Sequence, residues 1–231
     1  MALRILPVVR SREHRPKPRL ATLRSRTSQE GGRMPASKVD IRARQSPIRE
    51  GYRQHPQSAL IKLEVESATS DLSDPLHCAV TPMATPAVRW QSGAHPAVGG
   101  AGDVPCSGDL LLGALAACQE TTLRMVAANL GIDLESLHVT IEGDWDARGT
   151  LAIGDFPIGL TGIRCRTTVA VRGDVGGERA GRLLKSAEKY CVVLNTLRGG
   201  VPVESTFELK TPDVETDPPG PPARLFDAGA P

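Results

Sequence analysis

The stretch Ser107-Gly-Asp-Leu-Leu-Leu-Gly-Ala-Leu-Ala-Ala-Cys118 decides the fold of this chain. Its first residue is a good helix N-cap, and Asp109 places a negative charge in the first turn. No proline follows before Gly131, which supplies a C-terminal cap, so the sequence predicts a helix over 110–130. The first half of this helix is apolar all round, which indicates a central, buried position.

Short segments that alternate apolar and polar residues lie on both sides of this helix, and such alternation is typical of half-buried strands. The predicted strands are 61–66, 77–80 and 87–90 before the helix, and 137–148 and 162–171 after it, the last two spaced to pair as a long hairpin. A second helix at 178–190, a short helical segment at 192–197 and a last strand at 201–209 follow. This order predicts an α+β fold with antiparallel sheet.

Both ends of the chain have compositions that disfavour folding. Residues 1–46 contain twelve Arg and Lys against three Asp and Glu, and the sequence after Lys210 is rich in proline and mildly acidic. Such segments bury too little apolar surface to offset their ordering entropy. We therefore expect 1–46 and 211–231 to be disordered, with one domain at 47–210. The basic arm could be a targeting peptide, a nucleic-acid-contacting tail or sequence upstream of a start at Met34, and we favour an unstructured or misassigned extension.

Charge and composition also bear on several functional classes. The net charge of +2 comes from the basic arm, so no basic face is expected on the folded part. Aromatic residues make up 3% of the chain, which argues against a surface that stacks on nucleic-acid bases. No stretch reaches the roughly 18 apolar residues of a membrane span, so we expect a cytoplasmic protein with no membrane partner.

The five cysteines form an odd set without a C-x-x-C motif, and the adjacent pair His77–Cys78 is weak support for zinc. The glycines at 99–102 match neither G-x-G-x-x-G nor a phosphate-binding loop. We therefore expect no metal and no cofactor. Cys78 and Cys165 are interpreted as core residues, and Cys106 as a packed residue at the mouth of the central helix.

Two cysteines differ from the rest in their surroundings. Cys118 lies where the apolar half of the central helix meets polar residues, and it shares a helical face with Leu115 and Thr122. Its thiol can therefore line an apolar pocket that has a polar mouth. Cys191 ends the second helix, and sequence spacing leaves open whether the fold brings it to Cys118.

These two segments resemble the OsmC/Ohr family of osmotically inducible and organic-hydroperoxide-resistance proteins. The first segment, 107–124, is similar to the family's helix with an acid, a Leu run, Ala-Leu-Ala-Ala and a reactive Cys. The second, Ala187-Glu-Lys-Tyr-Cys191-Val-Val-Leu-Asn195, is similar to the segment with the second Cys, although Val192 occupies the usual Pro position. The resemblance covers about 47–209 and includes the order of the strands.

The resemblance implies a peroxidatic role for Cys118 and a resolving role for Cys191. A thiolate attacks the peroxide bond and becomes a sulfenic acid, and the second thiol then forms a disulfide with it. The resemblance also implies an organic hydroperoxide as substrate, an external dithiol as reductant, and an intertwined homodimer built around central helices.

The activating partner of Cys118 is the part of the family pattern that this sequence lacks. Hydroperoxide-specialised members place a Glu ten residues before the reactive Cys and pair it with an Arg, whereas this chain has Gly108 there, with Asp109 next to it. Candidate supporting residues are therefore Asp109, His95 as a nearby cation, and Glu120 as a local hydrogen-bond acceptor. The nearest upstream arginine is Arg89.

Two functions of different classes follow from these observations. The first is a thiol-dependent peroxidase that cycles Cys118 and Cys191 between dithiol and disulfide. The alternative is a non-enzymatic OsmC-like dimer that binds a small apolar ligand between its helices and whose cysteines are inert. A third, weaker hypothesis is nucleic-acid binding by the Arg-rich arm, which strongly salt-dependent binding would reveal.

Overall fold

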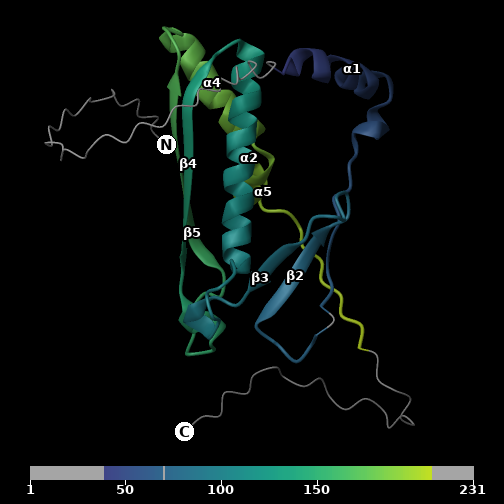
Figure 1. Cartoon of the computed structure of the whole chain (residues 1–231), viewed down its shortest axis with the longest axis vertical. Helices are drawn as coiled ribbons and strands as arrows, with labels where there is room; N and C mark the ends of the chain where they lie inside the picture. Colours follow the sequence, from purple (N-terminus) through teal and green to yellow (C-terminus); the bar gives the residue numbers. More distant parts are fainter. Residues whose placement is uncertain (1–38, 70, 210–231) are drawn as a thin grey trace, which may run out of the picture. The chain divides into compact units, whose positions relative to one another are not determined.

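The computed structural model describes residues 39–69 and 71–209. These residues form an α+β fold with two antiparallel sheets, as predicted. The central helix α2 (Ser107–Leu130) lies alongside a long hairpin, and α4 (Gly177–Tyr190) and α5 (Val192–Gly199) also pack against it (Figure 1). None of the helices in this part of the chain is long and apolar enough to cross a membrane.

The ends of α2 are fixed by the caps that the sequence indicates. At its start, the Asp109 carboxylate accepts a hydrogen bond from the backbone N–H of Cys106 at 2.9 Å, which makes Cys106 rather than Ser107 the N-cap. At its end, Gly131 adopts a left-handed conformation with φ of 64°, where a side chain would be strained. These two caps give the helix its full length of 24 residues.

The predicted hairpin is confirmed. Strand β4 (Leu134–Trp145) pairs antiparallel with β5 (Leu160–Val171), and the short helix α3 (Ala147–Thr150) lies in their connection. The register places Leu137 opposite Val169 and Ile141 opposite Cys165. The strands alternate exposed and partly buried residues, so one face of the hairpin is available to pack against the helices.

The main core lies between α2, α4 and this hairpin. Leu123 and Ala127 of α2 meet Leu183 and Ala187 of α4, and each of the four side chains is 1% exposed. Leu137 and Val169 of the hairpin pack against this cluster. The helical spacing of the apolar residues in both helices produces this packing. The expectation that the first half of α2 is buried all round is wrong, because Leu115 is the one buried residue of 110–118 and Leu111 is 41% exposed.

A second sheet contains β1 (Val65–Ser67), β2 (His77–Pro82) and β3 (Trp90–Gly93), in that order. The imidazole of His77 contacts the carboxylate of Asp74 at 2.7 Å and that of Asp103 at 3.0 Å. The hydrogen bond to Asp103, followed by the one to Asp74, raises the pKa of His77. This pair of contacts joins the start of β2 to the loop that precedes α2.

The structure differs from the sequence predictions at the two ends of the domain. The predicted strand at 201–209 is not a strand, because no described segment pairs with it, and β1 covers only the end of the predicted strand at 61–66. Helix α1 (Ile41–Gln54) was not predicted, and it begins inside the segment expected to be disordered. Two contacts support it: Asp40 caps its first turn, accepting from the backbone N–H of Ala43 at 3.0 Å, and Arg42 Nε donates to the carbonyl oxygen of Asn129 at 2.8 Å.

Residues 41–46 are therefore helical. The rest of the expected basic extension, 1–38, and the expected tail at 211–231 lie outside the described residues. The domain limits of 47–210 stay a prediction, with the described fold beginning a few residues earlier.

Replacing Leu123 with Ala is expected to lower the free energy of unfolding by about 2–5 kcal/mol, because it leaves a cavity in the core between α2 and α4. Urea unfolding at a fixed protein concentration, followed by circular dichroism, measures the change. Leu111→Ala on the same helix is the matched control, since Leu111 is 41% exposed against 1% for Leu123. Equal losses in the two variants would contradict the assignment of the core.

Candidate functional site

Cys118 and Cys191 lie together in a second, smaller cluster of the core. Cys118 is on α2 and half-buried, whereas Cys191 is 0% exposed at the junction of α4 and α5. Leu115 and Leu194 pack around them, together with side chains of the hairpin. Cys118 packs against the buried cluster that contains Cys191, and each of the two side chains shifts the pKa of the other. The structure thus brings together the two thiols that the sequence singled out.

The α4–α5 junction holds Cys191 in place through Asn195. The carbonyl oxygen of Cys191 accepts hydrogen bonds from the backbone N–H of Asn195 at 3.1 Å and from its side-chain amide at 2.8 Å. The same amide also donates to the carbonyl of Lys189 at 3.1 Å. Asn195 thereby ties the end of α4 to the first turn of α5. Asn195 belongs to the second cysteine motif, but this role was not predicted from the sequence.

The surroundings of Cys118 favour its thiolate. Burial raises the pKa of the Cys118 thiol, but hydrogen bonds outweigh this effect and leave the pKa below its usual value. The largest of these comes from the backbone N–H of Val193, followed by the side chains of Cys191 and Thr122 and the N–H of Val192. Val192 and Val193 form the first turn of α5, where backbone N–H groups lack helical partners and favour a negative charge.

The surroundings of Cys191 have the opposite effect. Burial is the largest of the effects that together raise the pKa of the Cys191 thiol to about 11, against a smaller lowering by the backbone N–H of Leu194. The hydrogen bond and the charge of Cys118, and the charge of Cys165, contribute to the same rise. Near neutral pH, Cys191 is therefore a protonated thiol that donates toward the sulfur of Cys118. The pair consists of one activated and one protonated sulfur.

The three candidate supporting residues are occupied elsewhere. Asp109 caps α2, nine residues before Cys118 and therefore about 13 Å away along the helix axis. His95 accepts from the backbone N–H of Ala97 at 3.0 Å and lies edge-on to Trp145, with 5.6 Å between ring centroids. Glu120 pairs with Arg124 at 3.3 Å on the exposed side of α2. Among the described contacts, none joins these three residues to either sulfur.

The activating groups are therefore backbone amides rather than a charged side chain. The sequence predicted a helical segment at 192–197, and every helix has free N–H groups at its start. The presence of such amides next to Cys191 could therefore be predicted. What the sequence did not specify is which thiol this helix end faces. Arg89, the nearest upstream cation in the sequence, is exposed.

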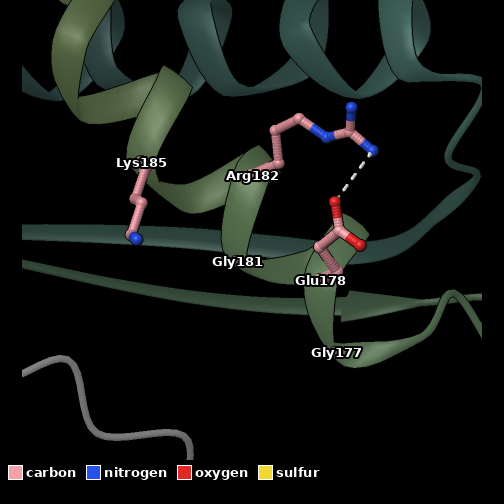
Figure 2. A pocket seen from close by; sticks show the side chains of 5 residues that line it. All are labelled: Gly177, Glu178, Gly181, Arg182 and Lys185. Atoms are coloured by element: carbon pink, nitrogen blue, oxygen red, sulfur yellow. Dashed lines mark ion pairs between the residues drawn. The ribbon is translucent and has the colours of Figure 1, made fainter.

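The surface near these helices has two hollows of different character. The first is formed by α4 alone, and Figure 2 shows the side chains of Glu178, Arg182 and Lys185 along it, with Arg182 and Glu178 paired at 3.9 Å. It contains no thiol. The second is a groove of about 620 Å³ lined by α1, α2 and α4, and Thr122 is among its lining residues.

No group of three or more His, Cys, Asp or Glu that could hold a metal ion occurs in the part of the chain that the structure describes. The chemical groups of the site are therefore the two sulfurs, the Thr122 hydroxyl and the amides of α5. A helix-borne, activated thiol beside a buried, protonated one defines the class of this protein as an α+β protein with a vicinal dithiol site.

Comparison with family models finds one match, over part of the chain. The model of the OsmC-like protein family matches residues 100–206, a segment that includes α2, both cysteines and the whole hairpin. This match identifies an OsmC-like domain in the chain and confirms the family that the sequence resembles. A comparison with curated proteins found no match.

Several solved structures are similar to this chain. An OsmC-like protein from Mycoplasma pneumoniae is 19% identical, and the alignment covers 61% of this chain and 89% of that one, with a TM-score of 0.48. The organic hydroperoxide resistance protein OsmC from Legionella pneumophila is 21% identical over 61% and 92% of the two chains, with a TM-score of 0.42. OhrB of Bacillus subtilis is 20% identical over 62% and 94%, with a TM-score of 0.40.

The thiolate of Cys118 is expected to form at lower pH than that of an ordinary cysteine, so its alkylation by iodoacetamide should rise with pH through a midpoint below about 8.5. Thr122→Val removes a hydrogen bond to this sulfur and should move the midpoint upward. Mass spectrometry of the Cys118 peptide after timed alkylation measures both midpoints.

Thr121→Val is the matched control for this measurement. The hydroxyl of Thr121 donates to the carbonyl oxygen of Ala117 at 2.7 Å within α2, and its loss should leave the midpoint of Cys118 unchanged. A midpoint at or above the ordinary thiol value in the unmodified protein would show that the amides of α5 do not activate Cys118.

Proposed function

We propose that the protein is a thiol-dependent peroxidase that reduces organic hydroperoxides through Cys118 and Cys191. The observation that carries this proposal is the contact between two thiols whose pKa values are shifted in opposite directions. A peroxidase of this kind needs a nucleophilic thiolate and, within reach of it, a second thiol that stays protonated until the first has reacted. The OsmC-like domain is consistent with such a role.

In the first step, the thiolate of Cys118 attacks the outer oxygen of the hydroperoxide. The S–O bond forms as the O–O bond breaks, the sulfur is oxidised to a sulfenic acid, and the alkoxide leaves as an alcohol after taking up a proton. The N–H groups of Val192 and Val193 stabilise the thiolate before attack. Thr122, whose side chain helps to lower the pKa of Cys118, is among the residues that line the groove between α1, α2 and α4, and we propose that the peroxide approaches from that side.

In the second step, the sulfur of Cys191 attacks the sulfenic acid of Cys118. The disulfide forms and water leaves, with the proton of the Cys191 thiol neutralising the departing hydroxide. The charge of Cys118 contributes to the raised pKa of Cys191, and a neutral sulfenic acid no longer carries that charge. Oxidation of Cys118 therefore makes Cys191 a better nucleophile. An external dithiol then reduces the disulfide and restores both thiols.

This cycle requires a compartment that keeps thiols reduced, which supports a cytoplasmic location for the protein. The alternative of an apolar-ligand-binding protein with inert cysteines predicts the opposite chemical behaviour. In that case Cys118 would react slowly with peroxide, and no disulfide would form. The two functions are therefore separated by one measurement on the reduced protein.

We further propose that the protein acts as a homodimer. The segment 201–209 belongs to neither of the two described sheets, and its side chains Val203, Phe207 and Leu209 are 86–92% exposed. Apolar residues at every second position are typical of a strand with one buried face. A second copy of the chain would supply both the pairing edge and the apolar cover that this segment lacks.

Cys118→Ser is expected to lower the rate of cumene hydroperoxide consumption on the order of 10³-fold or more, because it removes the nucleophile. Cys191→Ser should consume about one equivalent of peroxide and stop at a sulfenic acid, since no thiol remains to form the disulfide. Ferric–xylenol orange assays of the peroxide follow the turnover of the parent protein and of Cys118→Ser with a dithiol present. The single equivalent consumed by Cys191→Ser is measured without added thiol, by the same assay and by titration of free thiols.

Cys78→Ser is the control, because Cys78 is on β2 and is partly buried like Cys118. It should keep the activity of the parent protein. Peroxide consumption by Cys118→Ser at the parent rate would rule out the proposed peroxidase.

The full chain is expected to have a molar mass in solution of twice 24.6 kDa. The double variant Val203→Asp/Phe207→Asp should shift the mass toward the monomer, because it places charges on the apolar face of the unpaired segment. Light scattering coupled to size-exclusion chromatography measures the mass. Leu72→Asp, at a side chain that is 84% exposed elsewhere on the chain, should leave the dimer intact, and a monomeric parent protein would contradict the proposal.

A further inference from the structure

The groove lined by α1, α2 and α4 has a strongly positive lining. It has a volume of about 620 Å³ and is lined by Arg42, Arg49 and Arg53 of α1, and no Asp or Glu is among its lining residues. Its remaining polar lining includes Ser186 and Tyr190 of α4. A groove with three guanidinium groups and no carboxylate favours an anionic ligand.

The floor of the groove is one face of α2 that leads to the reactive thiol. Thr122, Val126 and Asn129 follow one another at helical spacing along this face, with Met125 and Leu130 beside them. Thr122 is in hydrogen-bond contact with Cys118. Asn129 follows Thr122 by seven residues, which corresponds to roughly 10 Å along the helix axis. The apolar part of the floor thus lies between the thiol end and the end at which α1 is attached.

The three arginines are not equally committed to contacts within the protein. Arg42 donates to the carbonyl oxygen of Asn129 and so attaches α1 to the end of α2. Arg53 pairs with Glu50 at 3.0 Å on its own helix. Arg49 donates to the neutral side chain of Gln45 at 3.0 Å and has no carboxylate partner among the described contacts. Arg49, together with Arg53, is therefore placed to bind an anion in the groove.

We propose that this groove binds an amphiphilic hydroperoxide by its carboxylate, with Arg49 and Arg53 holding the carboxylate and the peroxide group reaching Cys118 past Thr122. Guanidinium groups bind carboxylates through charge-assisted hydrogen bonds, and the apolar floor of α2 suits the chain between the two polar ends. The substrate role rests on the proposed peroxidase. The carboxylate site itself uses α1, which precedes the segment 100–206 that matches the family model.

The kinetic test compares a ten-carbon carboxylic acid that carries a terminal hydroperoxide with the methyl ester of the same compound. The full-length protein should have a KM for the acid about tenfold below that for the ester, which corresponds to the loss of one charged contact. Arg49→Gln/Arg53→Gln should raise the KM for the acid about tenfold. The same double variant should change the KM for the ester and both kcat values by less than about twofold, because neither arginine contacts the sulfurs.

Arg44→Gln is the matched control, because Arg44 is an exposed arginine on the same helix and is not among the residues that line the groove. It should keep the kinetic constants of the parent protein for both substrates. Equal KM values for acid and ester in the parent protein would overturn the inference. So would a double variant that raises the two KM values alike, since the arginines would then act without regard to the substrate charge.

A binding measurement separates this inference from the proposed reaction. Decanoate, which has no peroxide group, is titrated by calorimetry into full-length protein with Cys118→Ser, and into the same protein with both arginine substitutions. Decanoate binding that weakens about tenfold when both arginines are replaced supports the carboxylate site. So does binding to the protein with both arginines that weakens about tenfold at high salt. If decanoate binds but the parent protein consumes no peroxide, the proposed peroxidase fails and the site stands. If decanoate does not bind, the inference fails even where peroxide is consumed.

Discussion

The packing of α2 against the α4–α5 junction is the interaction on which the rest of the structure depends. It buries Leu115 beside Cys191 and Leu194, and it places the first turn of α5 against the sulfur of Cys118. The same packing continues along α2, where Leu123 and Ala127 meet α4 and the hairpin. One continuous helix thus provides a core-forming face and the reactive thiol. The thiol is held in position by the contacts that stabilise the fold.

The sequence predicted the elements whose signals are local. Helix α2 has its caps and apolar run within 24 consecutive residues, and the hairpin strands alternate over their whole length. The predicted strand at 201–209 has the same alternation but finds no partner among the described residues, and a strand requires a second strand to satisfy its backbone. Helix α1, by contrast, forms although the sequence did not predict it. Its sequence is rich in arginine and has Pro47 inside the helix, and it depends on the Asp40 cap and on the bond from Arg42 to Asn129, 87 residues away.

The same distinction explains which parts of the site were predicted. Cys118 and Cys191 could be selected because a reactive thiol requires a particular residue type in a recognisable segment. The activator could not, because it consists of the N–H groups of Val192 and Val193, and almost every residue has such a group. The charged candidates Asp109, His95 and Glu120 were chosen by residue type. Each of them is engaged by a neighbour within three or four residues or by an aromatic ring.

The pKa values of Cys118 and Cys191 are shifted in opposite directions because the two thiols differ in their hydrogen bonds from backbone amides and in their exposure to solvent. Burial raises the pKa of both thiols, but only at Cys118 do the hydrogen bonds that it accepts exceed this effect. Since part of the shift at Cys191 comes from Cys118 itself, the two pKa values are not independent. A negative charge on Cys118 keeps Cys191 protonated, and removal of that charge by oxidation makes Cys191 easier to deprotonate. In the proposed cycle, this coupling favours one order of reaction, in which Cys118 reacts first and Cys191 follows.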